Sequence, residues 1–224
     1  MPISGLLFDL DGTLLETEPG ILASFRHTLQ TLGLPPRSDA QLRTHIGPPL
    51  KTSWGELVGA ELTDRATEIY RQFYDAKGKF MARPYGGMLE ALAQLSTSYR
   101  LFIATSKRKV FALDMAEHFG LRPYFAEVYG LLPENLAEDK AALIARILLE
   151  QSLNPQETLM IGDRLYDLTG AKANGLGSIG VLWGYGSRGE LQAHHPTALC
   201  ERPADLPSII SDLALGAKAV SSRD

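Results

Sequence analysis

ISGLLFDLDGTL, residues Ile3–Leu14, is the segment from which the fold class can be inferred. Its first eight residues, Ile3–Leu10, form an apolar run that ends in acidic and turn residues, which predicts a short buried strand. Further strand-like runs are Leu101–Thr105, Thr158–Ile161, Ser178–Trp183 and, more weakly, Phe125–Tyr129. Strands that are apolar throughout, rather than alternating, indicate a parallel sheet that is covered on both faces.

Helical patterns separate these runs. Apolar residues recur at helical spacing in Gly87–Leu95, in Val110–Phe119 and, most strongly, in Lys140–Glu150. The alternation of strand and helix therefore predicts an α/β fold with an open parallel sheet and right-handed crossover connections.

A long stretch, residues 18–81, interrupts this alternation because it contains no strand-like run. Its pattern predicts helices over Gly20–Leu32, Ser38–Thr44, Lys51–Val58 and Thr63–Lys77. We therefore predict a helical domain, residues 17–82, inserted into a core made of residues 1–16 and 83–214. The expected return hinge is RPYGG at residues 83–87, and residues 215–224 are expected to form a frayed C-terminal tail.

The composition is typical of a soluble globular protein, with 45% hydrophobic and 21% charged residues among 224. The net charge of −4 leaves no electrostatic footprint for a nucleic acid polymer, and no apolar run approaches the length of a membrane span. Cys200 is the sole cysteine, so neither an intramolecular disulfide nor a thiolate zinc site can form. The N-terminus lacks the features of a signal peptide, so we expect a cytoplasmic protein without a membrane partner. The oligomeric state is not readable from the sequence.

Polar side chains follow three of the predicted strands. They are Asp9 and Asp11 after the first, Thr105, Ser106 and Lys107 after the second, and Asp163 and Asp167 after the third. Ligands of open α/β sheets bind outside the carboxyl ends of the strands, so these groups should converge at one edge. Carboxylates that meet at one place repel one another unless a cation is present, and hard oxygen ligands favour Mg²⁺.

The order of these motifs resembles that of the haloacid dehalogenase-like (HAD) hydrolase superfamily, over nearly the whole chain. FDLDGTL at Phe8–Leu14 is highly specific, and it is followed by Thr105 in FIATSK, by Lys140, and by GDRLYD at Gly162–Asp167. The resemblance implies a Rossmann-like core that is closed by an α-helical cap, which is the helical insertion. Within the superfamily, IGPPL at Ile46–Leu50 and GVLWGYGSRGEL at Gly180–Leu191 are similar to phosphoglycolate phosphatase-like and 5′-nucleotidase-like members. Glu16-Thr17 departs from the usual Asp-Ser of the family.

The resemblance also implies roles for individual residues. Asp9 would attack phosphorus and form an aspartyl phosphate, and Asp11 would protonate the leaving oxygen and then activate water. Thr105 would bind the phosphoryl oxygens, and Lys140 would neutralise Asp9 and the phosphoryl group. The implied Mg²⁺ ligands are Asp9, Asp11 (through its backbone carbonyl), Asp163 and Asp167. The implied phosphate and substrate contacts are Gly12, Thr105, Ser106 and Lys107 in the core, with Lys51 and His45 in the cap.

Several functions share these motifs. The sequence favours a Mg²⁺-dependent phosphatase acting on a small phosphorylated metabolite, most similar to phosphoglycolate phosphatases. The alternatives are a 5′-nucleotidase acting on nucleoside monophosphates, a phosphomutase and, least favoured, a non-catalytic phosphate-binding signalling protein. Two other patterns are set aside. Gly175–Gly180 fits G-x-G-x-x-G but precedes a strand, and His194-His195 has no spaced acidic partner.

Overall fold

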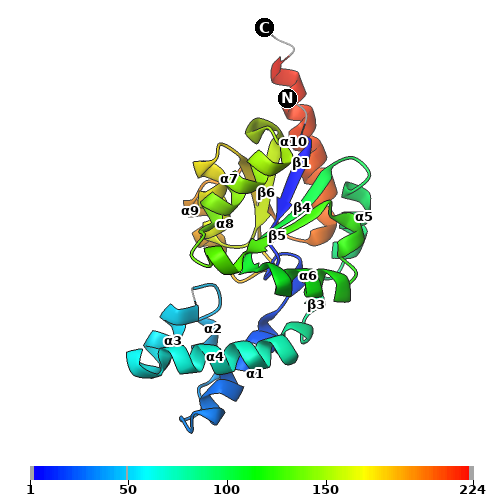
Figure 1. Cartoon of the computed structure of the whole chain (residues 1–224). Helices are drawn as coiled ribbons and strands as arrows, with labels where there is room; N and C mark the ends of the chain where they lie inside the picture. Colours follow the sequence, from blue (N-terminus) through cyan, green and yellow to red (C-terminus); the bar gives the residue numbers. More distant parts are fainter. Residues whose placement is uncertain (1–2, 49, 222–224) are drawn as a thin grey trace. The chain divides into compact units, whose positions relative to one another are not determined.

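The computed structural model describes residues 3–48 and 50–221 (Figure 1). The chain divides into two compact units, a core unit of Met1–Leu15 and Pro84–Asp224 and a helical unit of Glu16–Arg83. The two chain crossings between the units are short strands, β2 (Leu15–Glu16) and β3 (Arg83–Pro84), which pair in a two-stranded sheet. Strands of two residues leave no periodic signal, and the sequence did not predict them.

The core unit contains a six-stranded sheet in the order β5-β4-β1-β6-β7-β8, and all of its strand pairs are parallel. Its strands are β1 (Gly5–Phe8), β4 (Arg100–Arg108), β5 (Glu127–Leu131), β6 (Thr158–Gly162), β7 (Gly177–Val181) and β8 (Ala198–Cys200). The α/β fold predicted from the sequence is confirmed, while the three-residue edge strand β8 was missed. Strand order reverses at β1, between β4 and β6, so the switch point of the sheet lies where Asp9 and Asp11 follow β1.

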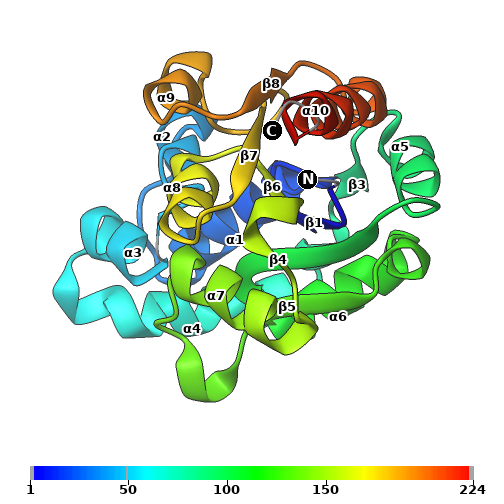
Figure 2. The ribbon, with the colours of Figure 1, turned by 90° about the horizontal axis from the view of Figure 1, so that it is seen from above.

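Helices cover both faces of this sheet. They are α5 (Met88–Leu95), α6 (Lys109–His118), α7 (Lys140–Gln151), α8 (Leu165–Ala173), α9 (Arg188–Ala193) and α10 (Leu206–Ser221). Helix α7 packs against α8, and α10 packs against α5 (Figures 1 and 2). Helix α10 continues to Ser221 and so includes most of the residues expected to form the tail, and their fraying stays a prediction. Residues 222–224 of the expected tail lie outside the described residues.

The register of the strands places Asp9 on the face that α7 covers. Leu7 is paired with Phe102 on β4 and with Met160 on β6, and all three are fully buried in one cluster with residues of α7. Because side chains alternate along a strand, Asp9 emerges on the same face as Leu7. Helix α7 begins there with an N-cap at Asp139, whose side chain accepts the N–H of Ala142 at 2.8 Å.

The helical unit has an aromatic core of its own. Its helices are α1 (Glu18–Thr31), α2 (Asp39–Arg43), α3 (Leu50–Val58) and α4 (Ala60–Ala76), followed by a 3₁₀ turn at Gly78–Phe80. The ring of Phe25 lies 4.9 Å from that of Trp54 and 5.1 Å from that of Tyr70, measured between centroids. Helix α1 and the 3₁₀ turn approach so closely that a Cβ on Gly20 would lie 1.9 Å from the carbonyl oxygen of Gly78.

Within the described residues, each helix falls short of the combined length and apolarity that crossing a bilayer requires.

Candidate active site

Lys140 contacts residues from three other parts of the core unit, namely Asp9 after β1, Ala104 in β4 and Asp167 in α8. Asp9 extends the pairing of β1 with β6, since its backbone N–H donates to the carbonyl of Ile161 at 2.9 Å. Lys140, the first residue of α7, donates from Nζ to Asp9 Oδ1 at 2.8 Å and to the carbonyl of Ala104 at 2.9 Å. The third neighbour of Nζ is Asp167 Oδ1, at 2.9 Å. Three acceptors therefore surround an ammonium group that has three protons to donate.

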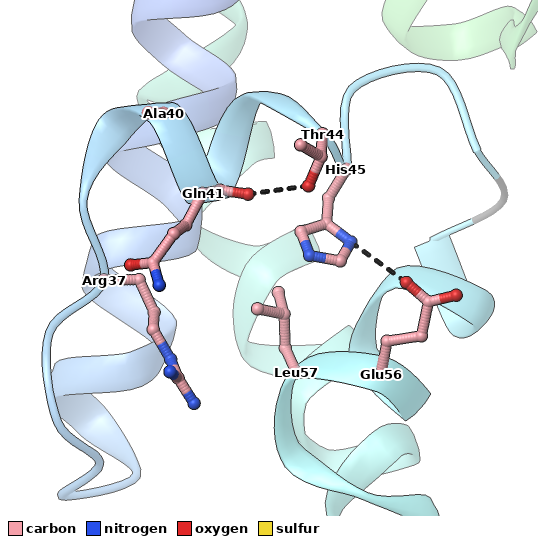
Figure 3. Close-up of a pocket in the computed structure, with 7 residues that line it drawn as sticks. All are labelled: Arg37, Ala40, Gln41, Thr44, His45, Glu56 and Leu57. Atoms are coloured by element: carbon pink, nitrogen blue, oxygen red, sulfur yellow. Dashed lines mark hydrogen bonds and ion pairs between the residues drawn. The ribbon is translucent and has the colours of Figure 1, made fainter.

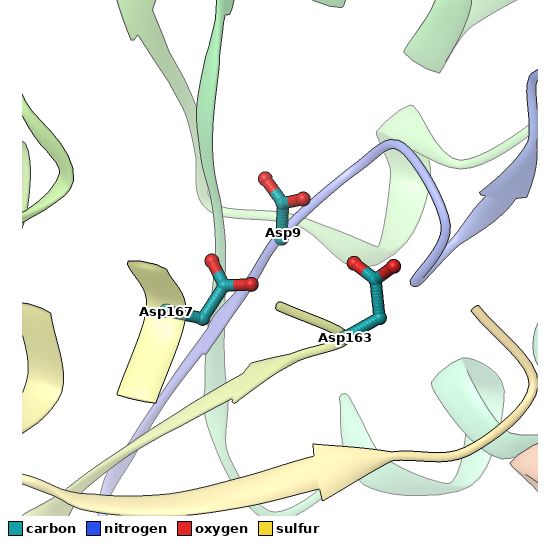
Figure 4. A group of neighbouring side chains, drawn as sticks. All are labelled: Asp9, Asp163 and Asp167. Carbon is teal, nitrogen blue, oxygen red and sulfur yellow. The ribbon is translucent and has the colours of Figure 1, made fainter. Parts of the chain in front are cut away.

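Asp163 and Asp167 follow β6 and complete a group of three carboxylates with Asp9. One oxygen from each of these side chains lies within 4.8 Å of the others (Figure 4). Asp163 accepts hydrogen bonds from Thr13 Oγ1 at 3.3 Å and from the backbone N–H of Tyr185 at 2.7 Å. Because carboxylates at this separation repel one another, a divalent cation among them would be stabilising.

Two glycines make room for these carboxylates. Gly12 has a φ of +77°, and a Cβ at this position would lie 2.4 Å from Asp163 Oδ2. A Cβ on Gly162 would lie 2.2 Å from the Cγ of Asp167. The sequence pattern D-x-D-G followed by G-D-x-x-x-D therefore has a steric basis, because neither glycine position admits a side chain without displacing an acidic residue.

Asp11 stands beside this group and pairs with a different lysine. Lys107 Nζ lies 3.1 Å from Asp11 Oδ2, whereas Asp11 Oδ1 is buried without a hydrogen-bond partner. The hydroxyl oxygen of Thr105 accepts the backbone N–H of Lys107 at 3.2 Å within the last part of β4, where the register with β5 shifts between Ala104 and Arg108. Ser106, between them in β4, is exposed. The structure thus brings the predicted core residues from four parts of the chain to one edge of the sheet.

The exposed fraction of the side chains decreases from Asp11 to Asp9 and then to Lys140 and Asp167. The side chain of Asp11 is 23% exposed and that of Asp9 13%, whereas those of Lys140 and Asp167 are 6% and 2% exposed. A molecule that approaches from solvent therefore reaches Asp11 and Asp9 first. The more deeply buried groups can hold Asp9 and a cation in place but are less accessible to a substrate.

Burial and crowding shift the acid–base properties of the cluster. The pKa of Asp9 is raised to about 6, because burial and the carboxylate of Asp167 raise it by more than Lys140 lowers it. Burial also raises the pKa of Asp163 well above its ordinary value, as do Asp167 and Asp9. For Lys140, burial alone would lower the pKa, but the carboxylates of Asp167 and Asp9 outweigh it and raise the pKa.

The donor set fits a hard divalent cation. When fully ionised, four carboxylates (Asp9, Asp11, Asp163 and Asp167) face two ammonium groups (Lys107 and Lys140), so the cluster has a surplus of two negative charges. All of the candidate ligand atoms are oxygens, which Mg²⁺ prefers. Burial and, after it, the neighbouring carboxylates raise the pKa values of Asp9 and Asp163, so a cation among these groups would favour their charged forms.

The predicted cap residues have partners within the helical unit. Lys51 Nζ lies 2.8 Å from Asp64 Oδ1, and His45 Nδ1 lies 3.6 Å from Glu56 Oε2. His45 and Glu56 line a pocket of about 460 Å³, together with Arg37 (Figure 3). Pro49, part of the IGPPL motif, lies outside the described residues. The roles of Lys51 and His45 toward a substrate stay predictions.

Sequence reasoning missed the residues that support the acidic cluster. Besides Thr13 and Tyr185, these include Trp183, whose indole Nε1 donates to the carbonyl of Thr13 at 2.9 Å, and Glu190, which contacts the turn before α8. Trp183, Tyr185 and Glu190 all belong to GVLWGYGSRGEL, which the sequence analysis used only as a likeness. Backbone donors such as the N–H of Tyr185 leave no signature in a residue type, so a contact of this kind is not predictable from composition.

Comparison with known proteins places these motifs in a family. The family model described as haloacid dehalogenase-like hydrolase matches residues 6–181. Among solved structures, a haloacid dehalogenase-like family hydrolase from Streptococcus pneumoniae superposes with a TM-score of 0.88 at 32% identity, covering 92% of this chain and 98% of that one.

Three curated relatives bear on function. A 5′-nucleotidase from Pseudomonas aeruginosa is 37% identical and is matched over 92% of this chain and 94% of its own. A phosphoglycolate phosphatase from Vibrio vulnificus is 27% identical, with 92% and 95% matched. Tyrosine-protein kinase PtkA from Mycobacterium tuberculosis is 37% identical over 81% of this chain, but the match spans only 62% of that protein.

Proposed function

Because the chain belongs to the haloacid dehalogenase-like hydrolase family and is one of its phosphatases, we propose that it hydrolyses a small phosphomonoester through Asp9, with Mg²⁺ bound at the acidic cluster. The observation that carries this proposal is the environment of Asp9. One of its oxygens is fixed at 2.8 Å from a buried lysine, while its side chain remains 13% exposed. A carboxylate held in this way has a fixed orientation, and its second oxygen can attack phosphorus.

The reaction would proceed in two displacements. In the first, an oxygen of Asp9 forms a bond to phosphorus as the bond from phosphorus to the leaving oxygen breaks, and Asp11 donates a proton to that oxygen. In the second, Asp11 takes a proton from water as the water oxygen attacks the aspartyl phosphate, which releases inorganic phosphate and restores Asp9. Asp11 suits both steps because it lies two residues beyond Asp9 and is the more exposed of the two.

Charge stabilisation would come from the last residues of β4 and from the metal. The Thr105 oxygen accepts the N–H of Lys107, so the Thr105 hydroxyl proton is free to be donated to a phosphoryl oxygen. Lys107, Gly12 and Ser106 are proposed as further contacts of the phosphate. Asp9, Asp163, Asp167 and the backbone carbonyl of Asp11 would hold Mg²⁺, which supplies neutralisation of the phosphoryl charge when bound.

For the substrate, we propose a nucleoside 5′-monophosphate, with 2-phosphoglycolate as the second candidate. The sequence alone favoured the opposite order. The order changes because the relative named 5′-nucleotidase is 37% identical, whereas the relative named phosphoglycolate phosphatase is 27% identical. Since the core groups contact only the phosphate, discrimination between leaving groups is proposed to lie in the helical unit, with His45 and Lys51 as candidate contacts.

The test is phosphate release from a panel of esters in the presence of Mg²⁺. The panel contains nucleoside 5′-monophosphates, 2-phosphoglycolate, pyrophosphate, a sugar phosphate and an aryl phosphate, and product analysis distinguishes hydrolysis from phosphoryl transfer within a sugar. We expect release that disappears with EDTA and in Asp9→Asn and Asp11→Asn. The matched control is Asp212→Asn, which neutralises an exposed aspartate on α10 and should retain full activity. Release that persists in Asp9→Asn would refute the proposed nucleophile.

A further inference from the structure

Glu190 contacts the turn that separates the two carboxylates following β6. Its Oε1 accepts the backbone N–H of Leu165 at 2.9 Å and the Nε–H of Arg164, also at 2.9 Å. Leu165 is the first residue of α8, whose initial N–H groups have no partner inside the helix. Arg164, at the N-cap position, has no side-chain acceptor to offer, so Glu190 supplies from another helix the acceptor that a capping residue would provide.

The position of this turn determines where Asp167 points. Asp167 Oδ2 accepts the backbone N–H of Arg164 at 3.1 Å. The carboxylate is therefore held by the same residue whose side chain donates to Glu190. The carboxylate also packs against Gly162, with no room for a Cβ there. A shift of the Arg164 backbone would therefore move the oxygens of Asp167 relative to those of Asp163 and Asp9.

Glu190 is itself fixed from the loop that holds Asp163. It lies in the first turn of α9, where the hydroxyl oxygen of Ser187 accepts its backbone N–H at 3.1 Å. The loop just before α9 donates the N–H of Tyr185 to Asp163, and a Cβ on Gly186 would lie 2.0 Å from the carbonyl oxygen of Asp163. One short segment, residues 184–190, thus supports Asp163 directly and Asp167 through the Arg164–Leu165 turn.

We propose that Glu190 is a positioning residue for the divalent-cation site: it holds the Arg164–Leu165 turn and thereby sets the affinity of the Asp163–Asp167 pair for the cation. The inference rests on the proposed function, which places Mg²⁺ at that pair. Groups that orient metal ligands from outside the coordination shell commonly change metal affinity by about 10- to 100-fold when they are removed. Glu190 does not contact the substrate phosphate in this scheme, so its removal should affect cation binding more than the chemical steps.

The experiment compares Glu190→Ala, Glu190→Gln and Glu201→Ala. Glu190→Ala removes both contacts, whereas the amide oxygen of Glu190→Gln can still accept from Leu165 and Arg164. Glu201→Ala is the matched control, because Glu201 forms an exposed ion pair with Arg188, the first residue of α9. Two quantities are measured, the Mg²⁺ concentration for half-maximal phosphate release and the dissociation constant of Mn²⁺ for the metal-free protein, followed by electron paramagnetic resonance.

We expect Glu190→Ala to raise both quantities about tenfold or more, with kcat at saturating Mg²⁺ within about threefold of wild type. Glu190→Gln should recover most of the affinity, and Glu201→Ala should match wild type. An unchanged Mn²⁺ dissociation constant in folded Glu190→Ala would overturn the proposal, as would a loss confined to kcat or thermal stability. A wild-type protein that binds Mn²⁺ but releases no phosphate would refute the proposed function and leave the Glu190 comparison intact. A wild-type protein that binds no cation would refute both.

Discussion

At the scale of single residues, the arrangement around Lys140 separates positioning from phosphate contact. Its ammonium group donates hydrogen bonds to Asp9 and to the carbonyl of Ala104 and forms an ion pair with Asp167 at 2.9 Å, so it is surrounded by groups of the protein. The side chain is also only 6% exposed. Lys140 is therefore better placed to fix Asp9 and compensate its charge than to bind a phosphoryl oxygen directly.

The glycine after Asp11 yields a prediction at this scale. Gly12→Ala combines a positive φ with a contact of 2.4 Å to Asp163 Oδ2, so it should lower the free energy of unfolding by about 2 kcal/mol or more and reduce phosphatase activity. Gly33→Ala is the matched control, since Gly33 has a φ of +67° with no atom within 4 Å of the added Cβ. It should cost only the backbone strain, about 1 kcal/mol, and leave activity unchanged. Urea denaturation and phosphate release measure both, and equal effects of the two variants would contradict the steric argument.

Cys200 provides a prediction of pH dependence away from the acidic cluster. Burial raises the pKa of this thiol to about 11, and its Sγ donates to the carbonyl of Arg202 at 3.2 Å. Because the thiolate is the reactive form, a pKa raised from 9.0 to about 11 lowers the thiolate fraction at pH 8 by about 100-fold. We expect negligible reaction of the native protein with a disulfide reagent at pH 8, increasing between pH 8 and pH 11. Rapid reaction of the native protein at pH 8, at the rate of the urea-unfolded chain, would show that the thiol is not protected.

At the scale of elements, helix α7 couples its N-cap to the active site, because Lys140 is the residue that follows the cap. Asp139→Ala removes the acceptor for the N–H of Ala142 and should cost about 1 kcal/mol of stability. It should also loosen the first turn of α7 and lower kcat. Asp139→Asn retains a capping oxygen and should restore both, and Asp212→Ala controls for loss of an exposed carboxylate. Chemical denaturation and initial rates test this, and Asp139→Ala with wild-type kcat would show that Lys140 is held without the cap.

The elements that the sequence predicted are those with a strong hydrophobic period. The buried strands β1, β4, β6 and β7 and the amphipathic helix α7 all fall close to their predicted ranges. The elements it missed are short or edge elements such as β2, β3 and β8, whose two or three residues are too few for a period to register. Helix α10 extends to Ser221, beyond the point at which the sequence indicated a tail, and the fraying of that tail stays a prediction.

The acidic residues of the candidate site were predictable for a related reason. A carboxylate directly after an apolar strand is visible in sequence, and strand topology then places Asp9 and Asp163 at one edge. The supporting contacts were not predictable, because they depend on backbone donors and on glycines at which a Cβ would clash. Glu190 looks in sequence like any exposed glutamate of a helix, and only its distances to Leu165 and Arg164 distinguish it.

At the scale of the whole molecule, the acidic cluster joins segments that are far apart in the chain. Asp9 follows β1, whereas Asp163 and Asp167 follow β6, more than 150 residues later. A cation held by all three would connect the two central strands of the core unit at their carboxyl ends. It would also compensate carboxylates whose pKa values are raised by burial and mutual repulsion. The metal-free protein therefore carries an unfavourable electrostatic term that a bound cation would reduce.

This coupling predicts how Mg²⁺ acts on global stability. A ligand that binds only the folded state stabilises it by about 2.7 kcal/mol at a concentration of 100 times Kd, so the Tm of the wild type should rise with Mg²⁺ and fall again with EDTA. Asp163→Asn should abolish this response. Without Mg²⁺ it should be at least as stable as wild type, because a buried carboxylate repelled by Asp9 and Asp167 is replaced by a neutral amide. Differential scanning calorimetry of both proteins, with Asp212→Asn as control, measures the shifts. A Tm that rises equally in Asp163→Asn would place the cation elsewhere, and an Asp163→Asn variant much less stable without Mg²⁺ would mean that the hydrogen bonds to Asp163 outweigh the repulsion.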